Sequence, residues 1–144
     1  MRYEEFTGQV QACAGLGSRQ AAERVVRATL ETVAERIPDG VAAHLAAQLP
    51  EEAADPLARV VAADETSPHR RAESRTRGEP FGLSVFAGRI AWRARVPEDT
   101  ALREASAVLE VLDAAVAPEL MRKLEDVLPD DIRAVLPSGR AETA

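Results

Sequence analysis

Apolar residues recur every three to four positions along most of the chain, which is the spacing of one face of an α-helix. Residues 3–14 carry Tyr3, Phe6, Val10 and Cys13 at this spacing. The pattern predicts a first helix whose apolar face is buried. On that face Cys13 is expected to be a core residue, and a thiol buried among apolar groups is unreactive.

A longer amphipathic segment follows between residues 18 and 37. Ser18 is expected to cap it, because its hydroxyl can accept a hydrogen bond from a free backbone N–H of the first turn. Glu31 and Glu35 fall on the side predicted to face solvent. The predicted buried stripe consists of Ala22, Val25, Val26, Thr29, Leu30, Val33 and Ile37.

A turn at residues 38–40 predicts a short third helix, and Pro50 ends that helix and begins the next. Glu51 and Glu52 then occupy the first turn of a fourth helix, where carboxylates interact favourably with the helix dipole. Paired carboxylates are also found in catalytic sites. Here we expect a structural role, because a helix–helix corner explains both acids.

The second half of the chain repeats the pattern of the first. The segment Leu45–Glu52 is echoed 79 positions later by Leu124–Asp131, with leucines, proline and paired acids at matching places. The echo predicts an all-α fold of two tandem copies of a small, roughly four-helix bundle, in residues 1–63 and 81–137. We expect the copies to be related by a pseudo-two-fold axis and to share one core. Two independent bundles are the alternative.

Between the copies, residues 64–80 have no helical periodicity and form a predicted polar linker. Arg70, Arg71, Arg75 and Arg77 give it a positive charge and make it a candidate anion-binding segment. The alternative is a solvated connector, and the segment has no aromatic residue on which a base could stack. Residues 138–144 are expected to be a frayed tail.

Composition limits the classes of function. The net charge of −6 disfavours a general affinity for nucleic acid, which makes nucleic acid a less favoured partner. One cysteine permits no intramolecular disulfide, and neither a signal peptide nor a membrane-spanning run is present in the sequence. We therefore expect a cytoplasmic protein that does not bind membranes.

No pattern predicts a metal site, a cofactor or a catalytic centre. The soft or imidazole ligands are Cys13, His44 and His69, which are scattered, and His44 is expected on a solvated face. The segment Gly15–Gly17 lacks the strand and the third glycine of a phosphate-binding loop. The sequence therefore predicts a non-enzymatic protein with no cofactor.

The first predicted helix of the second half carries a second apolar stripe, made of Val85, Trp92 and Val96. On a helix of 3.6 residues per turn, Trp92 lies opposite the main apolar stripe of Leu83, Phe86 and Ile90. It is expected either to pack between the two halves or to form a dimer or partner surface, where tryptophan is a frequent anchor. Arg89, Arg93 and Arg95 surround the stripe and could stack or form ion pairs there.

Several of these segments together resemble a known family. They are Tyr3–Phe6, the Ser18 cap, Leu45–Glu52, and the second copy from Phe86 through Val96–Asp99 to Leu128–Asp131. The combination resembles domain-of-unknown-function family 2267, a prokaryotic family of tandem helical repeats, over nearly the whole chain except the linker and tail. The resemblance implies an all-α fold and implies no activity.

Three hypotheses of function follow. The first is a protein-interaction or scaffold module that binds a protein partner or a second copy of itself through Val85, Trp92 and Val96. The second is a regulator that binds nucleic acid or another polyanion through the arginines of the linker. The third is a small-ligand carrier or an enzyme with a pocket between the repeats.

Overall fold

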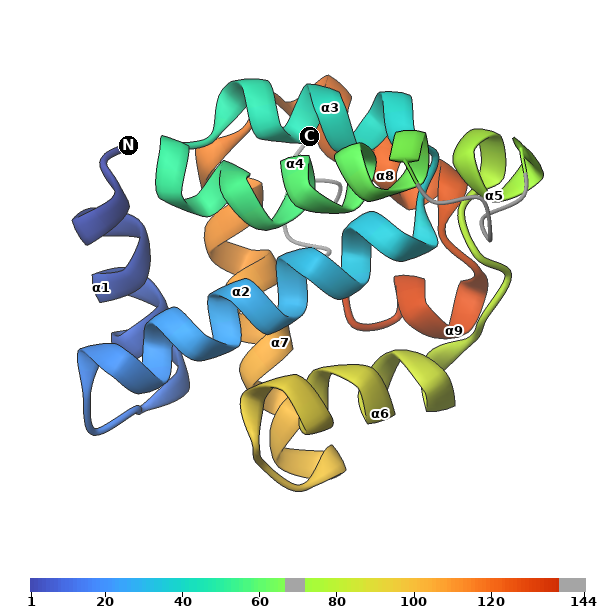
Figure 1. Cartoon of the computed structure of the whole chain (residues 1–144). Helices are drawn as coiled ribbons and strands as arrows, with labels where there is room; N and C mark the ends of the chain where they lie inside the picture. Colours follow the sequence, from blue (N-terminus) through green and yellow to red (C-terminus); the bar gives the residue numbers. More distant parts are fainter. Residues whose placement is uncertain (67–71, 138–144) are drawn as a thin grey trace.

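The computed structural model describes residues 1–66 and 72–137, and this part of the chain folds into nine helices without a strand (Figure 1). The prediction of an all-α fold is confirmed. The helices are α1 (Tyr3–Ala14), α2 (Arg19–Arg36), α3 (Asp39–Gln48), α4 (Glu51–Thr66), α5 (Ala72–Arg77), α6 (Leu83–Ala94), α7 (Glu98–Ala115), α8 (Pro118–Val127) and α9 (Asp130–Arg133).

Helix boundaries follow the local signals in the sequence. Ser18 caps α2 as predicted, and its hydroxyl accepts a hydrogen bond of 3.1 Å from the Ala21 N–H. Pro50, Pro97 and Pro129 each immediately precede a helix, and Pro118 is the first residue of α8. A proline at a helix start removes an N–H that has no partner within the helix.

Both halves of the chain contribute to one apolar core. Helices α1 and α6 have 12 residues each, α2 and α7 have 18 each, and α3 and α8 have 10 each. The fourth helices differ, with 16 residues in α4 and 4 in α9. The largest fully buried side chains come from both halves and include Phe6, Leu30, Leu57, Phe86, Leu112 and Ile132.

Two features of the middle segment differ from the predicted linker. Helix α4 extends to Thr66, and α5 forms within the stretch that lacks periodicity in the sequence. Arg70 and Arg71 lie outside the described residues, as do His69 and the predicted tail at residues 138–144.

Helix α1 buries Phe6 and Val10 as predicted, with Tyr3 packed against the core, but it does not bury Cys13. Its buried residues are Phe6, Thr7, Val10 and Ala14, whereas Cys13 is exposed. The row of residues four apart packs against α2 and α7, which turns Cys13 towards solvent. The prediction that Cys13 is a core residue is therefore wrong.

Helix α2 occupies a central position and crosses one face of the molecule between α4 and α6 (Figure 1). The segment before α6 folds back onto the C-terminal end of α2. There the Glu79 N–H donates a hydrogen bond of 2.9 Å to the Glu35 carbonyl. Arg36 Nε donates to the Phe81 carbonyl at 2.7 Å. Gly78 has a φ of +79°, and a Cβ there would collide with the Arg36 carbonyl oxygen, so this close approach requires glycine.

Side chains also join helix ends across the molecule. Asp131 Oδ2 accepts a hydrogen bond of 2.8 Å from the Leu83 N–H at the start of α6. Gln48 Oε1 accepts one of 2.7 Å from the Ala117 N–H before α8. Asp131 thus has the structural role expected for the acids that follow proline. Within the described ranges, no helix is both long and apolar enough to span a bilayer.

Candidate functional site around Trp92

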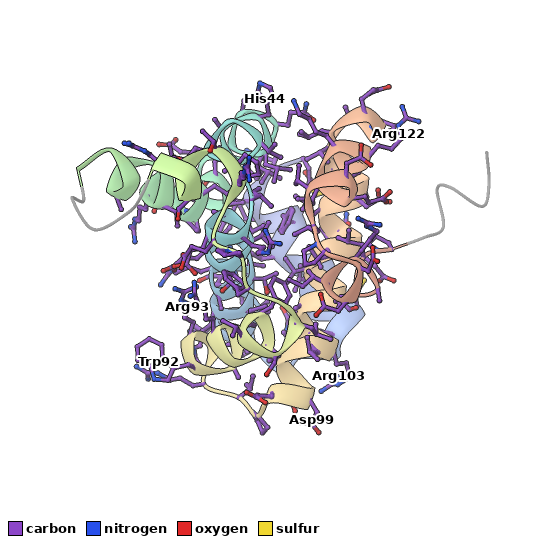
Figure 2. The ribbon with its side chains drawn as sticks, turned by 90° about the vertical axis from the view of Figure 1, so that its right-hand side faces the viewer. His44, Trp92, Arg93, Asp99, Arg103 and Arg122 are labelled. Atoms are coloured by element: carbon purple, nitrogen blue, oxygen red, sulfur yellow. The ribbon has the colours of Figure 1, made fainter. Side chains whose placement is uncertain are left out.

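Helix α6 buries one face and leaves the other open. Its buried residues are Phe86, Ala87, Ile90, Ala91 and Ala94, and this face packs against α2 and α7. On the opposite side Val85 is 44% exposed and Trp92 is 82% exposed. Figure 2 shows the Trp92 side chain at the edge of the molecule, directed away from the ribbon.

This exposure separates the two interpretations of the second apolar stripe. The prediction that Trp92 packs between the halves is wrong, because α6 docks through the Phe86–Ile90 face and turns Trp92 outward. Val96 is half-buried and packs at the margin of the core. The exposed surface is therefore formed by Val85 and Trp92, with Val96 at its edge.

An ion-pair cluster joins α2 to α6 on one side of Trp92. Arg93 makes a bidentate pair with Glu35, from Nη1 to Oε1 at 2.7 Å and from Nη2 to Oε2 at 2.8 Å. Arg89 donates to Glu35 at 3.1 Å and to both carboxylate oxygens of Glu79 at 3.1 and 3.2 Å. Its guanidinium also stacks on Phe81, at 4.3 Å from the ring centroid. We call Glu35, Glu79, Arg89 and Arg93 the ion-pair cluster.

The electrostatics of the cluster favour its charged form. Burial alone would raise the pKa of Glu35, but the hydrogen bonds and charges of Arg93 and Arg89 outweigh burial and hold that pKa below its usual value. Hydrogen bonds to Glu79 are the main cause that raises the pKa of Arg89. The ion pairs of Glu35 with Arg89 and Arg93 therefore join α2 to α6.

The sequence placed Glu35 on the solvated side of α2, and this prediction is wrong. Only 18% of its side chain is exposed, because α6 covers that part of α2. A signal was present in the sequence: Arg89 and Arg93 lie one helical turn apart, as do Glu31 and Glu35, so each pair shares one face of its helix. The sequence could not indicate that these two faces meet.

On the other side of Trp92, between α2 and α6, lies an open hollow of about 720 Å³. Arg24, Arg27 and Arg95 line it, and none of these three has an acidic group within ion-pair distance among the described residues. We call it the basic hollow. Its remaining lining residues are Ala28, Glu31, Ala91, Trp92, Arg93, Val96 and Pro97.

Trp92 therefore stands between two groups of arginines. A second hollow, of about 510 Å³, borders Trp92 on the side of Val85, and it is lined by the ion-pair cluster. The arginines on that side are matched by carboxylates of the same chain. The charges of Arg24, Arg27 and Arg95 in the basic hollow are not matched in this way.

A third hollow, of about 600 Å³, lies next to the basic hollow along α2, where α2 meets the first turns of α1 and α4. Burial and the nearby Glu23 raise the pKa of Tyr3 in its wall. We call it the acidic hollow, and Arg27 lines both it and the basic hollow. Its other lining residues are Tyr3, Glu23, Val26, Glu51, Glu52, Asp55 and Pro56.

The other predicted site residues do not join this surface. Arg75 and Arg77 lie exposed on α5 and line none of the three hollows. His44 is exposed on α3, as predicted (Figure 2). No group of three or more His, Cys, Asp and Glu side chains in the described ranges is arranged to hold a metal ion.

The described part of the molecule is thus all-helical, and it carries an exposed tryptophan beside arginines that have no ion-pair partner there. The chain belongs to the DUF2267 family, described as an uncharacterized conserved protein, and the family model matches residues 3–135. This confirms the resemblance seen in the sequence. A search of the curated proteins finds no match to the chain.

Proposed function

We propose that the chain is a non-enzymatic protein-interaction module built from two tandem helical repeats. The repeats are residues 1–63 and 81–137, related by a pseudo-two-fold axis. The matched lengths of α1 and α6, of α2 and α7, and of α3 and α8 support this arrangement, as does the recurrence of the leucine–proline–acid–acid segment. In this proposal the partner binds in the basic hollow, where α2 of one repeat meets α6 of the other.

The observation that carries the proposal is the position of Trp92. A tryptophan that is 82% exposed contributes little to its own fold, yet on binding it can bury a large apolar surface. It stands at the rim of the basic hollow, next to arginines that have no acid within ion-pair distance in the described part of the chain. The matching surface on a partner combines carboxylates with a large apolar side chain.

A protein partner fits this surface better than a nucleic acid does. The basic hollow has one aromatic side chain, whereas proteins that bind single strands stack successive bases on several. The acidic hollow adjoins it across Arg27, and its carboxylates would repel a phosphate backbone. Aliphatic side chains complete the lining, which suits an apolar protein side chain.

A peptide-display selection tests the proposal. The protein is immobilised at low density, so that copies do not cover one another, and is offered a random peptide library, with the Trp92→Ala variant as the counter-selection. We expect enriched peptides that combine Asp or Glu with a large apolar residue. Their affinity should fall at least about tenfold on Trp92→Ala and on Arg24→Glu/Arg95→Glu.

Two results would overturn the proposal. One is a selection that enriches nothing over the Trp92→Ala bait, combined with no self-association through the surface around Trp92. The other is a single-stranded oligonucleotide that binds the wild type more tightly than any enriched peptide does. Arg122→Glu/Lys123→Glu is the matched control, because it makes the same change of net charge on α8, with Arg122 far from Trp92 in Figure 2.

A further inference from the structure

The surface around α2 carries two hollows of opposite charge. The basic hollow presents Arg24, Arg27 and Arg95 without acidic partners in the described part of the chain. The acidic hollow presents Glu51 and Glu52, together with Glu23 and Asp55, which pair with Arg19 at 3.1 Å and with Arg59 at 2.8 Å. Arg27 lines both, so the two hollows adjoin across α2.

Such a surface is complementary to itself. In a pair related by a two-fold axis, the same patch serves on both copies, and every contact occurs twice. An axis that passes close to Arg27 would place the basic hollow of each copy opposite the acidic hollow of the other. Arg24 and Arg95 would then meet carboxylates of the other copy, whereas the two Arg27 side chains would lie near each other at the axis.

The shapes and apolar groups also match. Trp92 projects from the rim of the basic hollow, whereas the acidic hollow has a partly apolar wall of Tyr3, Val26 and Pro56. A tryptophan that entered this wall would lose most of its exposure. Trp92 would then be a buried aromatic anchor surrounded by ion pairs, which is a common arrangement at the centre of an interface.

We infer that a second copy of this chain is the partner, and that it binds as a two-fold homodimer in which each basic hollow faces the other copy's acidic hollow. The inference rests on the proposed function, and it names the molecule that occupies the basic hollow. It commits to self-association through α2, α4 and α6, with Trp92 of each copy buried against the other.

Charge reversal tests this arrangement directly. Arg24→Glu/Arg95→Glu makes both hollows acidic, and Glu51→Arg/Glu52→Arg makes both basic. Neither variant can pair with itself, but a mixture of the two is complementary at both contacts. Sedimentation velocity over a concentration series should show a wild-type dimer, with its Kd raised at least about tenfold in each variant alone and restored in the equimolar mixture.

Trp92 supplies an independent readout, because it is the only tryptophan in the chain. Its emission should shift to shorter wavelength as the wild type dimerises and as the two variants are mixed, but not when either variant is concentrated alone. Circular dichroism establishes that both variants are folded. Arg122→Glu/Lys123→Glu, which changes the net charge on α8 by the same amount as Arg24→Glu/Arg95→Glu does, should dimerise like the wild type.

Three results would overturn the inference. They are a wild type that stays monomeric at every concentration, reversal variants that dimerise as tightly as the wild type, and a mixture that fails to restore the dimer. A monomeric wild type that still selects acidic peptides would leave the proposed function standing with a different partner. If the peptide selection fails and the chain dimerises through another part of its surface, both the proposed function and this inference are wrong.

Discussion

Two groups of arginines on the same pair of helices differ in their partners. On one side of Trp92, Arg89 and Arg93 are satisfied by Glu35 and Glu79, with bonds as short as 2.7 Å. On the other side, Arg24 and Arg95 line an open hollow and have no carboxylate within ion-pair distance in the described ranges.

The difference separates a stabilising role from a binding role. Arginines that are half-buried and bidentate hold helices together, because removing either partner strands a charge that has lost part of its hydration. Arginines that stay solvated beside an exposed tryptophan add almost nothing to folding, and their charge is available to another molecule. The predictions below compare the two sides.

The largest effect is expected from Gly78→Ala, which attacks the paired side through its backbone. A Cβ would collide with the Arg36 carbonyl oxygen, and φ is +79°, so the segment that presents Glu79 would have to move. We expect the free energy of unfolding to fall by about 3 kcal/mol in chemical denaturation. Gly8→Ala is the control, because nothing lies within 4 Å of its Cβ position, and it should stabilise α1 by up to about 1 kcal/mol.

Glu35→Ala removes the carboxylate shared by Arg89 and Arg93. Because the Glu35 side chain is only 18% exposed, we expect a loss of about 2–3 kcal/mol of unfolding free energy. Glu31→Ala is the matched control on the same helix, since its contact with Arg93 is 3.7 Å and its side chain is 37% exposed. That control should cost under about 1 kcal/mol. Equal losses in the two variants would show that the ion-pair cluster does not hold α6.

The contribution of Glu35 should depend on pH in one direction. Its pKa in the folded protein lies below the ordinary value of 4.5, so the stabilisation is complete above that value and is lost as pH falls through the folded pKa. The difference in unfolding free energy between the wild type and Glu35→Ala should therefore narrow as the pH falls into the acid range. A difference that stays constant from neutral pH into acid would contradict the assignment.

The smallest effect on folding is expected on the unpaired side. Trp92→Ala and Arg24→Ala should each change the free energy of unfolding by less than about 0.5 kcal/mol, because both side chains are exposed. Thermal denaturation with circular dichroism checks this. A large loss in either variant would place that residue among the groups that hold the fold.

The sequence predicted most helices because their signals are local. Periodicity and the Ser18 cap marked the ends of α1 and α2 within a residue, and Pro50 marked the start of α4. Cys13 was wrongly placed in the core, because position 13 and position 14 both continue the helical spacing from Phe6 and Val10, and Ala14 is the one that is buried. The neighbours α2 and α7 select between them, and they are distant in the chain.

The candidate site was predicted in part. The stripe of Val85, Trp92 and Val96 was visible, because an apolar residue opposite a complete apolar face needs a second explanation. The hollows were not visible, because they arise where α2 meets α6 and where α2 meets α4. Nor could the sequence distinguish paired from unpaired arginines, since whether a carboxylate of α2 reaches Arg93 or Arg95 depends on how α2 packs against α6.

The most direct test of the binding role of Trp92 is its own fluorescence during a titration. A peptide enriched by the selection is added to the protein in solution at low concentration, and the wavelength of maximum Trp92 emission is recorded. The account predicts a shift to shorter wavelength that saturates together with binding measured by calorimetry. A peptide that saturates the protein while the emission of Trp92 stays unchanged would contradict it.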